Sequence, residues 1–225
     1  MILLIKLGKV RLTKTFKKEI ELMTILRKWF FTMGIVWGVL FLQIAAANPQ
    51  VDQAVQLLQQ GDVEKAANIL ATQANKENPE ACFYLSQVKL FGQEPDIETG
   101  LILLKKAISL GFPPAMDAMA GYYLYGEFVD QDHHKSLIYY QLAANRGYGP
   151  SQFNYGIMLK NGEKTPQDLE DAFVYLALAA LNQRDLEDLV EDAAMYRDEV
   201  ARKLTPTVYQ ESLVKVNKFM KKRPG

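Results

Sequence analysis

Apolar and small residues recur at spacings of three and four through most of the chain beyond residue 48. Two such runs are Leu85, Val88, Leu90 and Tyr155, Met158, Leu159. This spacing gives a helix one apolar face, and no segment shows a convincing alternation of the kind found in a half-buried strand. The pattern therefore predicts an all-α protein.

Three segments of the chain repeat one another, and they begin at Glu80, Pro114 and Pro150. Corresponding positions lie 34 to 36 residues apart. A period in this range is typical of stacked helix pairs, in which each pair buries its apolar face only against its neighbours. We therefore expect an array of antiparallel helix pairs.

Each repeat carries the same signals for the ends of its helices. The shared positions are a glycine (Gly92, Gly126, Gly162), an aspartate (Asp96, Asp132, Asp168) and an alanine (Ala107, Ala143, Ala179). Glycine accepts the left-handed backbone that ends many helices, and aspartate caps the free N–H groups that begin the next one. The small alanine allows helices to cross closely. The loop between the glycine and the aspartate is two residues shorter in the first repeat than in the second.

The two histidines of the chain, His133 and His134, follow Asp132 directly, a combination found in some metal-dependent phosphoesterases. However, Asp132 corresponds to the capping aspartates of the other repeats, which have no histidine. Adjacent helical residues also point about 100° apart, and no second cluster of ligands accompanies the pair. We expect these histidines to lie in a solvated first helical turn, and we expect no metal site, cofactor or catalytic residue.

The segments "QFNYGIMLKNG" and "KSLIYYQLAANRG" resemble the Sel1-like repeat, a relative of the tetratricopeptide repeat. The resemblance implies a right-handed superhelical solenoid with repeats at 79–113, 114–149 and 150–183. Residues 48–78 resemble a tetratricopeptide-like helix pair. Residues 184–225 resemble the closing helices of bacterial Sel1-like proteins, with a turn at Thr205 and Pro206 and a tail. These terminal units are expected to cap the stack.

The resemblance also implies a function, because Sel1-like proteins generally hold a partner protein or peptide along a concave surface lined by their first helices. The corresponding positions here are Phe83, Gln87, Leu90, Phe91, Asp117, Gly121, Leu124, Tyr125, Phe153, Ile157, Lys160 and Asn161. The three phenylalanines are equally open to interpretation as core, since aromatic residues at helical spacing usually are. Tyr125, beside the helix-ending Gly126, is expected to be exposed.

The N-terminal part of the chain has the features of a secretory signal peptide at residues 23–47. Basic Arg27 and Lys28 precede an apolar run at 29–44, and three alanines follow it. This order predicts cleavage between Ala47 and Asn48 and a periplasmic or secreted protein. The alternative is an uncleaved inner-membrane anchor. Residues 1–22 precede the natural start of such a signal, so we expect translation to begin at Met23.

Charge and cysteine content further limit the range of possible functions. The chain has 26 basic and 26 acidic residues, but 18 basic and 24 acidic residues follow residue 47, a net charge of −6. Nucleic-acid binding normally requires a basic surface, so we expect no such partner. The sole cysteine, Cys82, is expected to be a buried thiol.

Two other classes of function stay open beside the non-enzymatic scaffold. The resemblance includes cysteine-rich Sel1-like proteins associated with β-lactam binding or hydrolysis, and a peptidoglycan-related hydrolase belongs to the same alternative. The paired cysteines of those proteins are absent here. The other alternative is a structural envelope protein anchored in the membrane by its N-terminal apolar segment.

Overall fold

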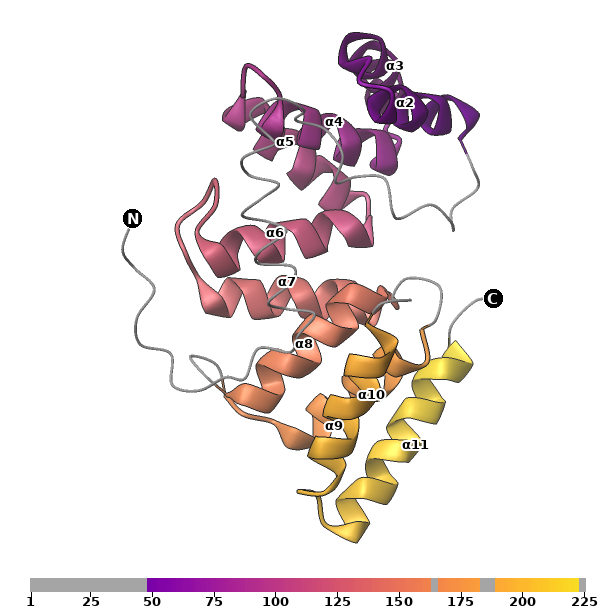
Figure 1. The fold of residues 1–225 in the computed structure, drawn as a ribbon, viewed down its shortest axis with the longest axis vertical. Coiled ribbons are helices and arrows are strands. Elements are labelled where there is room, and N and C mark those ends of the chain that lie inside the picture. Colours follow the sequence, from indigo (N-terminus) through magenta and orange to yellow (C-terminus); the bar gives the residue numbers. More distant parts are fainter. Residues whose placement is uncertain (1–47, 163–165, 183–188, 223–225) are drawn as a thin grey trace.

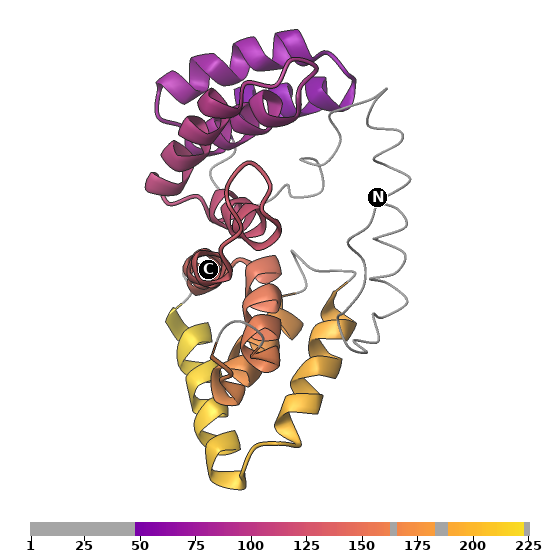
Figure 2. The same ribbon diagram turned by 90° about the vertical axis from the view of Figure 1, so that its left-hand side faces the viewer.

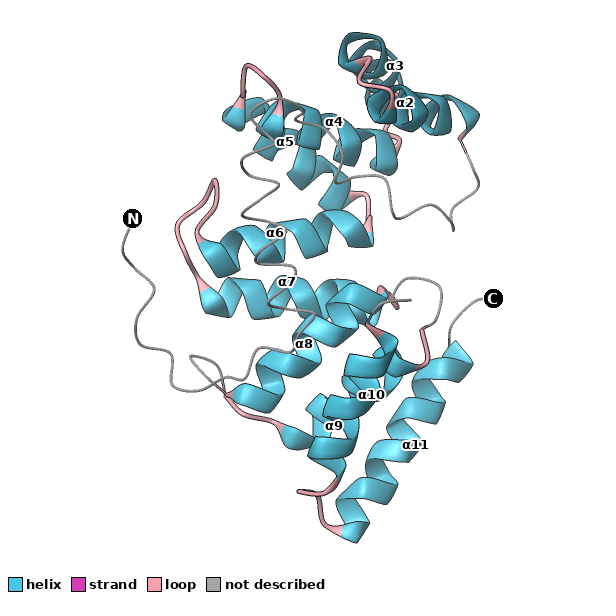
Figure 3. Ribbon diagram, in the orientation of Figure 1, coloured by secondary structure: helices cyan, strands magenta, loops and turns pink. Residues whose placement is uncertain are grey.

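The computed structural model describes residues 48–162, 166–182 and 189–222. The expected upstream extension and signal peptide at 1–47 therefore lie outside the described residues. All the regular structure in the described part is helical (Figure 3). The helices are α2 (Pro49–Gln59), α3 (Val63–Asn75), α4 (Pro79–Phe91), α5 (Ile97–Ser109), α6 (Pro113–Tyr125), α7 (His133–Asn145), α8 (Gly149–Asn161), α9 (Leu169–Ala180), α10 (Val190–Ala201) and α11 (Pro206–Lys222).

The helices form consecutive pairs that stack one after another along the molecule (Figure 1). In the pairs α2/α3, α4/α5, α6/α7 and α8/α9, each helix packs mainly on its partner and on the next helix in the chain. The predicted all-α repeat solenoid is confirmed. The N-terminal pair, which the sequence placed at 48–78, comprises α2 and α3.

Aspartate caps begin the second helix of each pair, as predicted for the three repeats. The side chains of Asp62, Asp96, Asp132 and Asp168 accept hydrogen bonds from the backbone N–H three residues further on, at distances from 2.9 to 3.4 Å. An N-terminal carboxylate satisfies a free donor and also complements the helix dipole. The same aspartate cap therefore sets the residue at which each second helix starts.

Glycines end the first helices in two different ways. Gly126 and Gly162 adopt the predicted left-handed backbone, with φ of 71° and 65°. The same prediction is wrong for Gly92, whose φ is −65°, because the shorter loop of the first repeat runs straight on to Asp96. A side chain at Gly92 would place its Cβ 2.5 Å from the carbonyl oxygen of Val88. Glycine is thus required there by close approach of the backbone.

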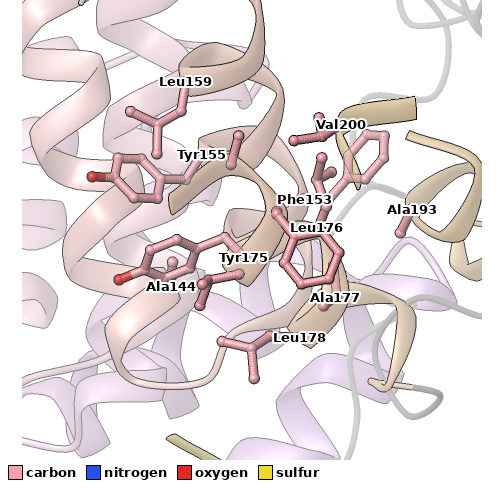
Figure 4. Close-up of a cluster of buried hydrophobic side chains, with 14 of the residues drawn as sticks. Ala144, Phe153, Tyr155, Leu159, Tyr175, Leu176, Ala177, Leu178, Ala193 and Val200 are labelled. Carbon is pink, nitrogen blue, oxygen red and sulfur yellow. The ribbon is translucent and has the colours of Figure 1, made fainter. Parts of the chain in front are cut away.

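The core consists of two clusters of buried side chains that meet at α6. One cluster extends from α2 to α6 and contains Cys82, which is fully buried as predicted. Burial raises the pKa of the Cys82 thiol. The other cluster extends from α6 to α11 around α9, whose residues 172–179 are all buried (Figure 4). The contact between α5 and α6 is sparse compared with that between α3 and α4 or α7 and α8.

The last two helices pack differently from the repeats. The turn at Thr205 and Pro206 joins them as predicted, with the Thr205 hydroxyl accepting a hydrogen bond from the Val208 N–H at 3.3 Å. However, α10 and α11 each pack on α9 instead of mainly on each other. Figure 2 shows them diverging on either side of α8 and α9. The two C-terminal helices therefore cap the stack from either side of the third repeat.

We expect Gly156→Ala to lower the free energy of unfolding by about 1–3 kcal/mol, because overpacking forces neighbouring groups apart. A Cβ at Gly156 would lie 2.8 Å from Leu176 Cγ and 3.2 Å from the Leu176 backbone nitrogen. The matched control is Gly121→Ala, where the nearest atom to a new Cβ is the Tyr140 hydroxyl at 3.9 Å. There the substitution should stabilise the protein by roughly 0.5–1 kcal/mol through helix propensity. Urea unfolding measures both, and equal effects at the two sites would contradict this account of helix crossing.

Candidate binding face on the first helices

The twelve predicted groove residues lie on α4, α6 and α8, the first helices of the three repeats. On each helix, three of them stand four residues apart and so share one side of the helix. We call this side of the three helices the first-helix face. Its central stripes are Phe83, Gln87, Phe91; Asp117, Gly121, Tyr125; and Phe153, Ile157, Asn161.

In the first repeat, the predicted residues are largely occupied by contacts within the protein. Leu90 is 2% exposed and lies against Gly100 of α5, so it belongs to the core and is not available to a ligand. Phe83 is half-buried, with its ring 5.5 Å from that of Phe112. The Gln87 side chain accepts a hydrogen bond from the Tyr122 hydroxyl at 3.3 Å, which joins α4 to α6.

The loop between α6 and α7 folds back onto the end of α4 through an aromatic cluster. Phe128 contacts the rings of Phe91 and Tyr122 edge to face, with centroids 5.1 and 5.0 Å away. Phe128 has a φ of 61°, a left-handed backbone that is uncommon for a bulky residue. Sequence reasoning missed Phe128, because nothing in a loop sequence shows which helix the loop will contact. Phe91 remains 43% exposed, so it is a structural contact with one open side.

In the third repeat, α10 covers part of the first-helix face. Phe153 is 7% exposed, and its ring lies 6.1 Å from that of Tyr196. The Lys160 ammonium lies 4.8 Å above the Tyr196 ring and pairs with Glu199 at 3.1 Å. These contacts make Phe153 and Lys160 part of the C-terminal packing and not of an open groove. Of the other predicted residues here, only Asn161 is exposed.

The second repeat presents the open part of the face. Tyr125 is 70% exposed, as predicted. One turn before it, Gly121 leaves space above α6, and the Tyr140 hydroxyl borders that space. A further turn back, the partly exposed Asp117 accepts a hydrogen bond from the Ser151 hydroxyl at 2.6 Å. Leu124, the fourth predicted residue of α6, is half-buried against the C-terminal core cluster.

Asp117 occupies a position where the other two repeats have Phe83 and Phe153. Burial raises the pKa of the Asp117 carboxyl to about 6, and the hydrogen bond from Ser151 opposes this only in part. Burial raises the pKa of Tyr140 well above its ordinary value, and the charge of Asp117 adds to the effect. Among the described residues, no basic side chain forms an ion pair with Asp117.

The histidine pair lies in the first turn of α7, as predicted, with His134 exposed. The preceding Asp132 is engaged in capping the helix and pairs with the Lys135 ammonium at 3.3 Å. Across the described ranges, no group of three or more His, Cys, Asp or Glu side chains is placed to hold a metal ion. Within those ranges, no helix has the length and apolar character required to cross a membrane.

The sequence contains two Ser-x-x-Lys spacings, at 86–89 and 212–215. This spacing occurs at the nucleophile of penicillin-binding enzymes. Here Ser86 and Ser212 are fully buried, and their hydroxyls donate to backbone carbonyls of their own helices at 2.6 and 2.8 Å. Lys215 pairs instead with Glu170, at 2.9 Å. Both serines therefore serve helix packing.

We expect Asp117→Asn to stabilise the protein at neutral pH, because the amide still accepts the Ser151 hydrogen bond without burying a charge. The Asp117 pKa of about 6 lies above its ordinary 3.8, so the native protein loses stability as the pH rises between these values. The gain should reach about 1–3 kcal/mol above pH 7 and vanish below pH 4. Thermal unfolding across this range measures it. Glu211→Gln, an exposed site on α11, is the control, and a pH-independent difference for Asp117→Asn would contradict the burial argument.

Comparison with known proteins identifies the repeat. The family model of the Sel1 repeat matches residues 79–112, 113–148 and 149–183. An uncharacterized protein of Neisseria meningitidis serogroup B is 30% identical over 88 residues, which are 39% of this chain and 19% of that protein. The chain thus spans about a fifth of the length of this curated relative.

Two repeat proteins are among the solved structures similar to this one. A protective antigen of uropathogenic Escherichia coli with an SLR fold superposes with a TM-score of 0.50 at 18% identity, over 77% of this chain and 45% of that one. A Sel1 repeat protein from Oxalobacter formigenes is 28% identical, with a TM-score of 0.48, over 51% of this chain and 88% of that one. The three matched segments and the stacked helix pairs show that the chain contains three Sel1 repeats.

Proposed function

We propose that this protein is a non-enzymatic scaffold that binds a segment of a partner protein along its first-helix face, centred on the second repeat. Sel1 repeats commonly mediate protein–protein interaction. The observation that carries the proposal is the open stripe Asp117, Gly121, Tyr125. It lies between a first repeat held by Phe128 and a third repeat covered by α10.

The residues of this stripe suit recognition of a peptide. An exposed tyrosine offers a large apolar surface with a polar tip, and such residues are frequent among those that dominate binding energy. The glycine beside it leaves room for a side chain of the partner, and the carboxylate beyond adds a polar anchor. The face therefore combines shape with a small number of placed polar groups, as peptide-binding surfaces do.

We further propose that the protein is exported and that its signal is cleaved after Ala47. The basic residues, the apolar run at 29–44 and the three alanines support this. Cleavage there would also leave the cap of α2 in place, since the Asn48 side chain accepts a hydrogen bond from the Gln50 N–H at 3.1 Å.

A photo-crosslinking amino acid placed at Tyr125 should capture a partner of defined mass in living bacterial cells. The matched control is Ile102, which is 59% exposed on α5, a second helix outside the proposed face. We expect adducts from position 125 that are at least several-fold more abundant than those from position 102. Adducts from position 102 alone, or equal adducts from both, would show that the first-helix face is not the binding surface.

The intact mass of the protein recovered from the bacterial envelope tests the export proposal. Cleavage after Ala47 should give a chain that begins at Asn48, in the soluble periplasmic fraction. A mass that retains residues 23–47, recovered with the inner membrane, would support the anchored alternative instead.

A further inference from the structure

Asp117 is placed at a cost to the stability of the free protein. The carboxylate is held between α6 and α8 by a single hydrogen bond from Ser151, and no described basic side chain pairs with it. A charge in such surroundings is unfavourable unless an opposite charge and further hydrogen bonds accompany it. The equivalent positions of the neighbouring repeats avoid this cost with phenylalanine.

A second polar group borders the same space. Tyr140 on α7 is 4% exposed, and its hydroxyl forms no hydrogen bond with any described residue. It lies 3.9 Å from where a Cβ at Gly121 would stand. Among the described residues, only Gln152 Oε1 is a fully buried side-chain atom without a partner, so the Tyr140 hydroxyl keeps contact with solvent. The hydroxyl therefore reaches solvent beside Gly121, and Asp117 lies one turn before Gly121 on the same side of α6.

The shape of this space indicates how it would be filled. Gly121 contributes no side chain, so a group from outside can approach the backbone of α6 between the carboxylate and the hydroxyl. Tyr125 stands one turn further along the same side of the helix, with 70% of its surface exposed. A tyrosine ring next to a carboxylate offers a cation both an ion pair and a favourable contact with the ring face.

We infer that the space bounded by Asp117, Gly121, Tyr125 and Tyr140 is a pocket for a lysine or arginine side chain of the bound partner. The cation would pair with the Asp117 carboxylate and lie beside the Tyr140 hydroxyl, while its alkyl stem lies along Gly121. The net charge of −6 beyond residue 47 favours a basic partner at longer range. This inference rests on the proposed function and names the chemistry that the first-helix face selects.

Binding of the full chain to defined peptide pools tests the pocket. Each pool contains acetylated and amidated nonapeptides with uncharged residues at eight randomised positions and a fixed centre of lysine, arginine, glutamine, glutamate or norleucine. One further norleucine pool keeps a free N-terminal amine. The proteins compared are the natural chain, Asp117→Asn and the control Glu211→Gln, which removes the same charge on α11, with helicity checked by circular dichroism.

We expect the natural chain and Glu211→Gln to retain the lysine and arginine pools about tenfold or more above the norleucine pool. Asp117→Asn should lose this preference while keeping its weaker binding of neutral pools. Neutral binding without a cation preference, or a preference unchanged in Asp117→Asn, would overturn the pocket and leave the scaffold standing. Equal retention of the free-amine pool would assign the site to a terminal ammonium, contrary to the inference. No retention of any pool would contradict the scaffold and the pocket together.

Discussion

Close crossing of the two helices in each repeat is the constraint on which the rest of the structure depends. The crossing is possible because small residues stand where the helices meet, as at Gly156 against Leu176 and Gly100 against Leu90. Each pair then buries an apolar side that would be unstable alone, and the next pair covers what remains. Because every second helix starts at an aspartate cap, the pairs keep one geometry and the first helices share a common face.

Departures from this regularity define the candidate site. The aromatic contact of Phe128 holds the first repeat to the second where α5 and α6 touch only sparsely. At the other end, α10 covers the first-helix face of the third repeat through Tyr196. Phe91 and Asn161 keep an exposed side, and on α6 Tyr125 is exposed two turns after the position where a carboxylate replaces phenylalanine. A residue that costs stability at an accessible position is better explained by a ligand than by packing.

The sequence predicted those features that local chemistry decides. The repeat period, the aspartate caps of the three repeats, the exposure of Tyr125 and the burial of Cys82 follow from spacing, capping and residue size. The sequence predictions that failed concern residues whose surroundings are set by tertiary contacts. The burial of Leu90 and the cover over Lys160 depend on how neighbouring helices pack, and α10 gave no sign in sequence of the surface it would meet. The same packing decides Phe153, which the sequence left open between core and groove. Likewise, the raised pKa of Asp117 depends on burial by neighbouring helices, which the hydrogen bond from Ser151 of α8 opposes only in part.

The most direct test of the central claim is the titration of the Asp117 carboxyl in the full chain, followed by carbon NMR without and with a retained lysine-centred peptide. We expect a midpoint near 6 for the free protein, because the carboxylate is mostly buried and accepts one hydrogen bond, from Ser151. The midpoint should fall on binding, since a nearby cation favours the ionised form. A midpoint that the bound peptide leaves unchanged would contradict the claim that this carboxylate serves a cation of the partner.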